Sequence, residues 1–257
     1  HRVPANNRES AAAHCTGRAF AKRFGIERVH DVGYDQGIAQ VLVANYGYAL
    51  PGTVLVCADS HTGAAGAFNC AARGIGVPDV ILAATTGKTW FEVGPTLRYE
   101  LEGKLKPGVL TKDVFLHIAA EYGDHVTRNI EYGGSALPHL SMDARRTLCT
   151  MGTELNAEFS IFEPDAVLLD YMSKRTAKTY TPQYPDRDAD YEARRVINLD
   201  RLLTDLGNML RRLIREDIEI KQNLAPELWS VIADPDQVEQ VIAWTFAPYD
   251  TLIYPFF

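Results

Sequence analysis

The sequence lacks the features that mark secreted, membrane-spanning and nucleic-acid-binding proteins. It has only 4 cysteines among 257 residues and no Cys-x-x-Cys pair, so we expect reduced thiols rather than a disulfide framework or a local metal site. No apolar run reaches the roughly 18 residues of a membrane helix, and no signal peptide is visible. The net charge of −7 argues against nucleic acid and anionic membranes as partners. We therefore expect a cytoplasmic protein whose partners are small molecules or other proteins.

Two common phosphate-binding motifs are also incomplete. Gly87-Lys88-Thr89 would need a glycine at position 82 to form a P-loop, and Leu82 stands there. Gly74-Ile75-Gly76 lacks the third glycine of a dinucleotide fingerprint, because position 79 holds Asp79. The sequence therefore supports neither a P-loop nucleotide site nor a dinucleotide site.

The residues that are present indicate an α/β protein. Hydrophobic residues make up 46% of the chain, which excludes intrinsic disorder. Residues 53–57 form a short apolar run that predicts a buried strand, and the small residues of 63–72 suit a helix packed tightly against a sheet. Pro78 suits the first turn of a further helix that runs to about Gly87. A strand followed by a small-residue helix is the pattern of α/β folds.

The remaining pattern to residue 200 continues this alternation. Residues 172–195 are polar and contain two prolines, so we expect a solvent-facing helix end and a loop there. The other expected elements are a helix at 11–24, a half-exposed strand at 97–103, a helix at 111–122, a strand at 129–134 ending in glycines, a helix from about Ser141 and a strand at 159–162.

One local motif could carry chemistry. Asp59-Ser60-His61 places a carboxylate, a hydroxyl and an imidazole at the end of a predicted strand, where open α/β sheets bind ligands. An aspartate beside a histidine can orient the ring for proton transfer. The alternative is structural: Asp59 and Ser60 would cap the following helix, and His61 would satisfy a buried polar contact.

Residues 1 to about 200 resemble the aconitase family, and within it most closely the large subunit of 3-isopropylmalate dehydratase. The likeness implies an aconitase-like three-layer α/β domain, here incomplete. Because His1 is not preceded by an initiator methionine, we expect further sequence before it. The motifs that carry the likeness, in the order of the family, are Asp59–Thr62, Gly66-Ala67, Gly74–Asp79, Thr86–Phe91, Val93–Thr96, Gly103–Leu105, Lys112-Asp113, Ile130–Gly134 and Leu148–Glu154.

The resemblance implies a hydro-lyase that reversibly dehydrates a hydroxy di- or tricarboxylic acid, with a four-iron four-sulfur cluster binding the leaving hydroxyl. It implies catalytic roles for His1, Asp59, His61 and Glu131, and a substrate contact for Ser60. For Glu131 the alternative is a surface glutamate on a strand. The likeness further implies a small carboxylic acid substrate and a separate small dehydratase subunit as partners.

Two departures from the family bear on activity. Gln40 stands where the family usually has a histidine, and an amide cannot act as an acid. No cysteine follows Cys149, whereas the family's three cluster ligands lie beyond the matched region, and a cluster needs thiolates. We therefore expect no cluster on this chain and no activity from it in isolation. The alternative function is a non-catalytic carboxylate-binding or scaffold protein.

The residues from 201 onward have a different texture and predict a short α+β appendage. Apolar residues recur at helical spacing from Leu202 to Ile214, and the segment 201–257 resembles the start of a sensor histidine kinase ATP-binding domain. It lacks the asparagine that holds magnesium in that family, so we expect no nucleotide binding. A signalling fragment remains the second alternative function, with the domain boundary placed between residues 200 and 201.

Overall fold

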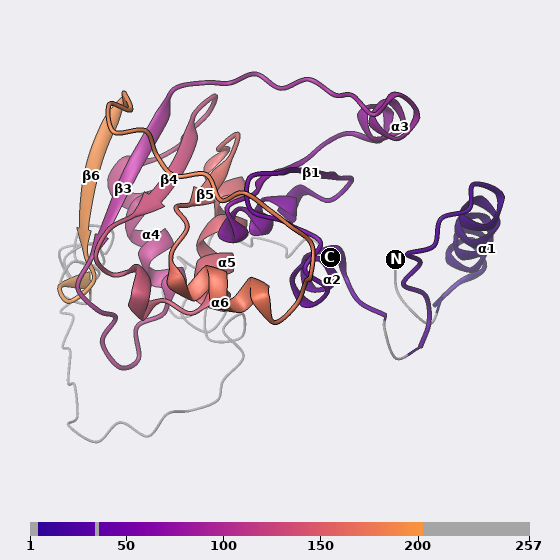
Figure 1. Cartoon of the computed structure of the whole chain (residues 1–257), viewed down its shortest axis with the longest axis horizontal. Coiled ribbons are helices and arrows are strands. Elements are labelled where there is room, and N and C mark those ends of the chain that lie inside the picture. The colour runs from indigo at the N-terminus through magenta and orange to yellow at the C-terminus, as the bar shows by residue number, and fades with distance from the viewer. Residues whose placement is uncertain (1–4, 34–35, 203–257) are drawn as a thin grey trace, which may run out of the picture. The chain divides into compact units, whose positions relative to one another are not determined.

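The computed structural model describes residues 5–33 and 36–202 of the chain (Figure 1). Every described residue belongs to one compact unit, which lies within His1–Leu213. The elements expected beyond residue 202 lie outside the described residues, and the boundary after residue 200 stays a prediction. No helix in the described ranges is both long enough and apolar enough to cross a membrane.

A four-stranded parallel sheet organises the second half of the described chain. Its strands are β3 (Thr96–Glu102), β4 (Asn129–Gly133), β5 (Ser160–Phe162) and β6 (Ala193–Asn198), in the order β5-β4-β3-β6. A second sheet pairs β1 (Val54–Cys57) with β2 (Ala71–Gly74), also in parallel. Parallel strands need long crossover connections, which helices supply here. The predicted α/β class with parallel sheets is confirmed.

Several helices begin at a capping side chain. Ser141 accepts from the Ala144 N–H at 3.2 Å before α5, and Asp165 accepts from the Leu168 N–H at 3.0 Å before α6. The helices are α1 (Arg8–Arg23), α2 (Ala39–Asn45), α3 (Val77–Thr86), α4 (Thr111–Tyr122), α5 (Met142–Met151) and α6 (Ala166–Ser173), with the 3-10 segments η1 (Ser60–Phe68), η2 (Leu137–His139) and η3 (Gly152–Leu155).

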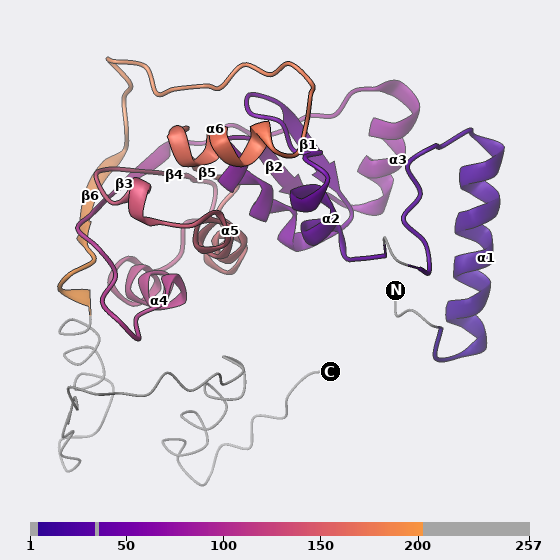
Figure 2. The same ribbon diagram turned by 60° about the horizontal axis from the view of Figure 1, so that its bottom comes forward.

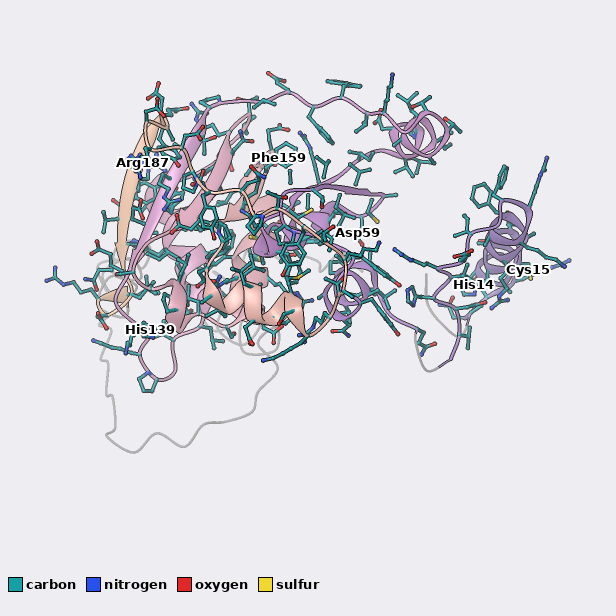
Figure 3. The ribbon with its side chains drawn as sticks, viewed as in Figure 1. His14, Cys15, Asp59, His139, Phe159 and Arg187 are labelled. Atoms are coloured by element: carbon teal, nitrogen blue, oxygen red, sulfur yellow. The ribbon has the colours of Figure 1, made fainter. Side chains whose placement is uncertain are left out.

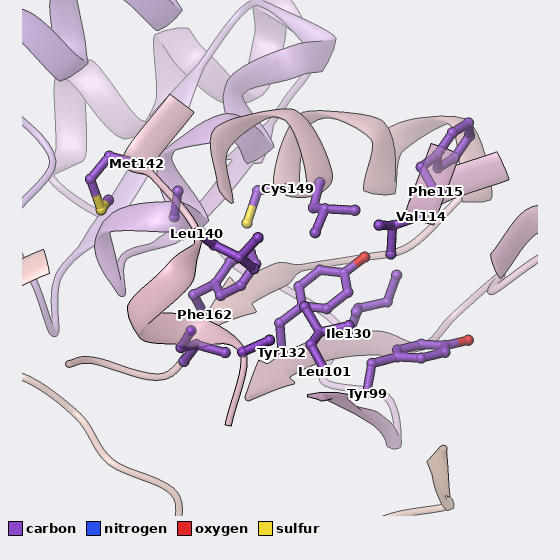
Figure 4. Packing of buried hydrophobic residues seen from close by; sticks show 14 of the residues in the cluster. Tyr99, Leu101, Val114, Phe115, Ile130, Tyr132, Leu140, Met142, Cys149 and Phe162 are labelled. Atoms are coloured by element: carbon purple, nitrogen blue, oxygen red, sulfur yellow. The ribbon is translucent and has the colours of Figure 1, made fainter. Parts of the chain in front are cut away.

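The core lies where α4 and α5 pack against the four-stranded sheet (Figures 2 and 4). Tyr99, Tyr132 and Phe162 occupy the same register on β3, β4 and β5. Their rings lie 5.9 and 4.8 Å apart in succession, and all three are buried. Burying such a side chain contributes about 1.5–3 kcal/mol, so this aromatic row is a main source of the sheet's stability.

A buried arginine ties α5 to the start of α6. The Arg145 side chain is fully buried and donates to both carboxylate oxygens of Asp165, at 2.8 and 2.6 Å, and to the Leu137 carbonyl at 2.7 Å. Burial raises the pKa of Asp165, but the hydrogen bonds from Arg145 and the Leu168 N–H outweigh it, so the net pKa is lowered. The pair therefore stays charged inside the protein.

Four expectations from the sequence were wrong in detail. Residues 71–74 form β2 instead of continuing a helix, because Asn69 adopts a left-handed conformation (φ 56°) and turns the chain. Val54 at the start of β1 is 62% exposed and the rest of β1 is only partly buried, so β1 is not the buried strand that the apolar run predicts. The strand at 97–103 is largely buried, because β3 lies inside the sheet between β4 and β6. The loop expected to residue 195 ends earlier, because β6 begins at Ala193. As an edge strand, β6 tolerates charged residues.

Candidate functional site

Asp59, Ser60 and His61 lie at the junction between β1 and η1, where Figure 3 labels Asp59. Asp59 is the N-cap of η1: its Oδ1 accepts from the backbone N–H of His61 at 2.8 Å. The same Oδ1 accepts from the side-chain amide of Gln40 on α2. Thr62 Oγ1 donates to the Asp59 carbonyl at 2.6 Å. The capping role proposed for Asp59 is therefore present, together with a side-chain partner from another helix.

The His61 ring is held between two oxygen groups. Its Nε2 lies 3.3 Å from Oε1 of Glu154, and its Nδ1 lies 3.1 Å from Oγ of Ser60. A carboxylate only accepts hydrogen bonds, so Nε2 carries a proton in this pair. Nδ1 then accepts from Ser60 when the ring is neutral and donates to it when the ring is protonated. The His61 side chain is 44% exposed, which does not fit the alternative of a buried polar contact.

Glu154 is a site residue that its own sequence motif did not indicate. It lies in η3, directly after α5, and 93 positions separate it from His61. Thr153 Oγ1 donates to the Ser60 carbonyl at 3.1 Å, which holds η3 against the Asp59–His61 segment. The only signal in the sequence was the family-like motif that ends at Glu154. Nothing local to that motif indicates the pairing, because the contact is made by tertiary packing of η1 against α5 and η3.

Gln40 occupies the position where the family usually has a histidine. Its carbonyl accepts from Arg146 Nη2 at 3.2 Å, and its side-chain amide reaches Asp59. Its Oε1 atom is buried and has no hydrogen-bond partner among the described residues. The Gln40 side chain therefore orients Asp59 as a neutral donor, without a titratable proton.

Glu131 lies in the middle of β4, and its role as a catalytic group stays a prediction. Its carboxylate accepts from Arg98 and, at 2.9 Å, from the Tyr191 hydroxyl. No hydrogen bond or ion pair joins it to Asp59, Ser60 or His61, all of which lie in the described part of the chain. The Glu131 side chain is 23% exposed, so the alternative of a surface glutamate does not describe it well either.

The guanidinium beside Glu131 is buried and shared among several carboxylates. Arg98 donates to Glu100 at 2.9 Å and to Glu163 at 2.6 Å, in addition to Glu131. Burial alone lowers the pKa of Arg98, but the hydrogen bonds and charges of Glu100 and Glu163 outweigh it and raise the pKa. This group of charges is satisfied within the protein, and it joins β3, β4 and the end of β5.

Two cavities adjoin these groups. One, of about 390 Å³, is lined by Ser60, Arg73, Cys149 and Thr153 among others. The second, of about 440 Å³, is lined by Glu131 and Glu163 with mostly apolar neighbours. Phe159, labelled in Figure 3, lines both. The sequence-predicted Ser60 and Glu131 thus border neighbouring cavities and not a single one.

The described residues do not fit an iron–sulfur cluster. All four cysteines are free, and no group of three or more His, Cys, Asp or Glu side chains within residues 5–33 and 36–202 could hold a metal ion. Burial raises the pKa of the Cys70 thiol to about 11 and that of Cys149 further, so neither supplies a thiolate near neutral pH. His1, the first predicted catalytic residue, lies outside the described residues.

Comparison with known proteins supports the motif likeness. Residues 6–205 match the aconitase family (aconitate hydratase). The 3-isopropylmalate dehydratase large subunit of Mycolicibacterium smegmatis is 46% identical over 202 residues, which cover 79% of this chain and 48% of that protein. Its counterpart "large subunit 1" from Methanopyrus kandleri is 39% identical over 204 residues (79% and 48%).

A second group of relatives carries a different name. The "Probable methanogen homoaconitase large subunit" of Methanothermobacter thermautotrophicus is 37% identical over 193 residues, which cover 74% of this chain and 45% of that protein. The chain thus spans about half the length of the curated relatives that it matches. Over most of its own length, from residue 6 to residue 205, this chain belongs to the aconitase family.

Proposed function

We propose that this chain carries the proton-handling part of a hydro-lyase site for a hydroxy di- or tricarboxylic acid. The observation that supports the proposal best is the arrangement of His61 between Glu154 and Ser60, next to a cavity that Ser60 lines. Loss of a hydroxyl group as water requires a proton donor beside the leaving oxygen. The relatives are named 3-isopropylmalate dehydratase and homoaconitase, so we propose isopropylmalate or a tricarboxylic acid of the homoaconitase reaction as the substrate.

The bonds of the His61 ring support a defined proton path. Glu154 accepts from Nε2 and keeps a proton on that nitrogen, so the mobile proton is the one between Nδ1 and the Ser60 hydroxyl. Protonated His61 donates to Ser60 Oγ, and the Ser60 O–H then faces outward to the leaving hydroxyl. Asp59 holds the backbone of this segment through the cap on the His61 N–H.

The substrate's carboxylates need cationic partners, and Arg73 is the candidate at this cavity. It lines the cavity beside Ser60 and forms an ion pair with Glu158. Because Glu158 neutralises this arginine, we propose that the described residues bind a carboxylic acid only weakly.

We also propose a separate small dehydratase subunit as a protein partner, because the curated relatives are named large subunits. The free thiols of the chain support a cytoplasmic location.

A chimera tests the proposed function. Residues 6–205 would replace the matching segment of the M. smegmatis large subunit, and dehydration of 3-isopropylmalate would be measured with the relative's small subunit present. We expect measurable turnover, and a loss of about 10²–10⁴-fold in kcat for His61→Gln. Gln40→His, which restores the residue usual in the family, should raise the rate. If the chimera folds but neither it nor its Gln40→His variant shows turnover, the proposal is overturned and the non-catalytic binding protein is favoured.

The tail carries a separate prediction. The match to the aconitase family ends at residue 205, and the likeness of 201–257 to a histidine kinase ATP-binding domain rests on the sequence motifs alone. We propose that the tail binds no nucleotide, because the magnesium-holding asparagine is missing. A magnesium-dependent ATP affinity in the micromolar range, measured by calorimetry on the full chain, would contradict this.

A further inference from the structure

A buried chain of polar groups lies beside the site and takes no part in the proton path described above. Tyr99 on β3 and His125, in the turn between α4 and β4, are both fully buried. The Tyr99 hydroxyl lies 2.6 Å from His125 Nε2, and Arg195 on β6 donates to the same hydroxyl oxygen at 2.6 Å. His125 Nδ1 lies 2.8 Å from the Gly123 carbonyl.

These contacts determine where the protons lie. A carbonyl only accepts, so His125 Nδ1 carries a proton that it donates to Gly123. The Tyr99 oxygen accepts from Arg195, and its own proton is then free to be donated to His125 Nε2. All the hydrogen bonds among Arg195, Tyr99, His125 and Gly123 are therefore made when the His125 ring is neutral. A protonated ring would leave the Tyr99 hydroxyl facing a second donor.

The backbone of His125 connects this chain of polar groups to the candidate site. Its N–H donates to the Leu155 carbonyl at 2.7 Å, and Leu155 is the last residue of η3, next to Glu154. The neighbouring Asp124 accepts from Asn156 Nδ2 at 3.4 Å. Thus η3 is held on one side by the turn at His125 and on the other by the bond from Thr153 to Ser60.

We propose that His125 is a positioning residue for Glu154: the ring, locked by Tyr99 and Gly123, holds the backbone N–H that places η3 and thereby sets the Glu154 carboxylate against His61. This inference rests on the proposed function, since Glu154 matters only if His61 handles the proton. It gives a role to a buried histidine whose ring makes its hydrogen bonds to Tyr99 and Gly123 and not to the His61 ring. The position needs a side chain that donates at one end and accepts at the other, and a neutral imidazole does both.

The surroundings of His125 favour the neutral ring. Burial lowers the pKa of His125, the Gly123 bond opposes this, and the positive charges of Arg195 and Arg128 lower it further, while Asp124 raises it. From α4, the Tyr122 ring lies 4.1 Å below the Arg195 guanidinium and keeps that cation near the Tyr99 hydroxyl. No carboxylate contacts the His125 ring in the described part of the chain.

The test compares two tyrosine variants of the full chain. Tyr99→Phe removes the hydroxyl that locks His125, whereas Tyr122→Phe removes a hydroxyl from the same neighbourhood and keeps the lock. Nitrogen-15 NMR of the His61 ring reports its tautomer, and Glu154→Ala supplies the signal of a His61 ring without its partner. We expect Tyr99→Phe to move the His61 ring signals toward those of Glu154→Ala, and Tyr122→Phe to leave them in place.

Amide exchange separates positioning from a general loss of stability. In Tyr99→Phe the His125 N–H should exchange about tenfold faster than in the parent while the β4 amides keep their protection. His125→Gln should restore part of the His61 signal that His125→Ala loses, because glutamine again offers an acceptor to Tyr99. If the His61 signals shift in Glu154→Ala but stay unchanged in folded Tyr99→Phe and His125→Ala, the positioning role of His125 is overturned. The proposed function then still stands. Signals unchanged in Glu154→Ala would instead overturn the pairing on which the proposed function rests.

Discussion

His61 Nε2 lies 3.3 Å from Glu154 Oε1, across 93 positions of sequence and between two segments that meet only in the folded chain. Four backbone and side-chain bonds support this pair from both ends: the Asp59 cap on the His61 N–H, the bonds from Thr150 and Thr153 to the carbonyls of residues 61 and 60, and the bond from His125 to Leu155. The proposed proton chemistry depends on this pair, which leads to the following expectations.

Replacing Glu154 should change the His61 ring, and replacing Glu131 should not. Glu154→Ala removes the acceptor that keeps a proton on Nε2, so the neutral ring should populate the Nδ1–H tautomer more than in the parent. Glu131 bonds to Arg98 and Tyr191 and has no bond to His61. Nitrogen-15 shifts of the ring measure the tautomer directly. A changed tautomer in Glu131→Ala with an unchanged one in Glu154→Ala would reverse our assignment.

Removing the carboxylate that pairs with Arg145 should destabilise the protein strongly. Arg145 is fully buried, so Asp165→Asn leaves an uncompensated charge in the core and should cost about 3–5 kcal/mol in the free energy of unfolding. Asp170→Asn is the matched control, because the Lys174–Asp170 pair is exposed and should be worth less than about 1 kcal/mol. Urea unfolding of the two variants gives the comparison, and equal losses would contradict the role of Arg145.

Acid should destabilise the fold through His125. Its pKa in the folded protein is lowered from 6.5 mainly by burial. Below pH 6.5 the unfolded chain therefore binds a proton that the folded protein does not, and stability falls as the pH drops from there toward the folded pKa. One such group contributes a slope of at most about 1.4 kcal/mol per pH unit. Urea unfolding between pH 7.5 and 5 should show a shallower slope in His125→Gln; an identical slope would assign the effect to other groups.

The four cysteines should differ in reactivity. Cys15 on α1 is exposed, whereas Cys70 and Cys149 are buried and burial raises the pKa of both thiols. Only a thiolate reacts rapidly, so iodoacetamide at neutral pH should label Cys15 first and leave Cys70 and Cys149 protected. Peptide mass spectrometry gives the labelled positions, and labelling in urea is the control. Fast labelling of Cys149 in the native protein would show that the core around α5 opens.

Much of the local structure could be predicted because its causes are local. The helix at 111–122 has the predicted bounds, since a Leu110 N–H bonded to the Asp113 carboxylate at 2.7 Å starts it and Gly123 ends it. The junction of β1 and η1 at Asp59 follows equally from an apolar run, a capping aspartate and small residues. The strand β6 could not be predicted in this way, because Arg194 and Arg195 obscure its alternation until pairing with β3 defines it.

What the sequence by itself determined is the family, the α/β class and the Asp59–Ser60–His61 motif, because each is written in consecutive residues or in the order of short motifs. Only the tertiary structure decided which carboxylate serves His61. Glu131 and Glu154 are both acidic residues in family-like motifs, and choosing between them requires knowing that η3 packs beside η1 while Arg98 and Tyr191 occupy the carboxylate of Glu131. Partners so remote in sequence are selected by packing, and packing is a property of the whole chain.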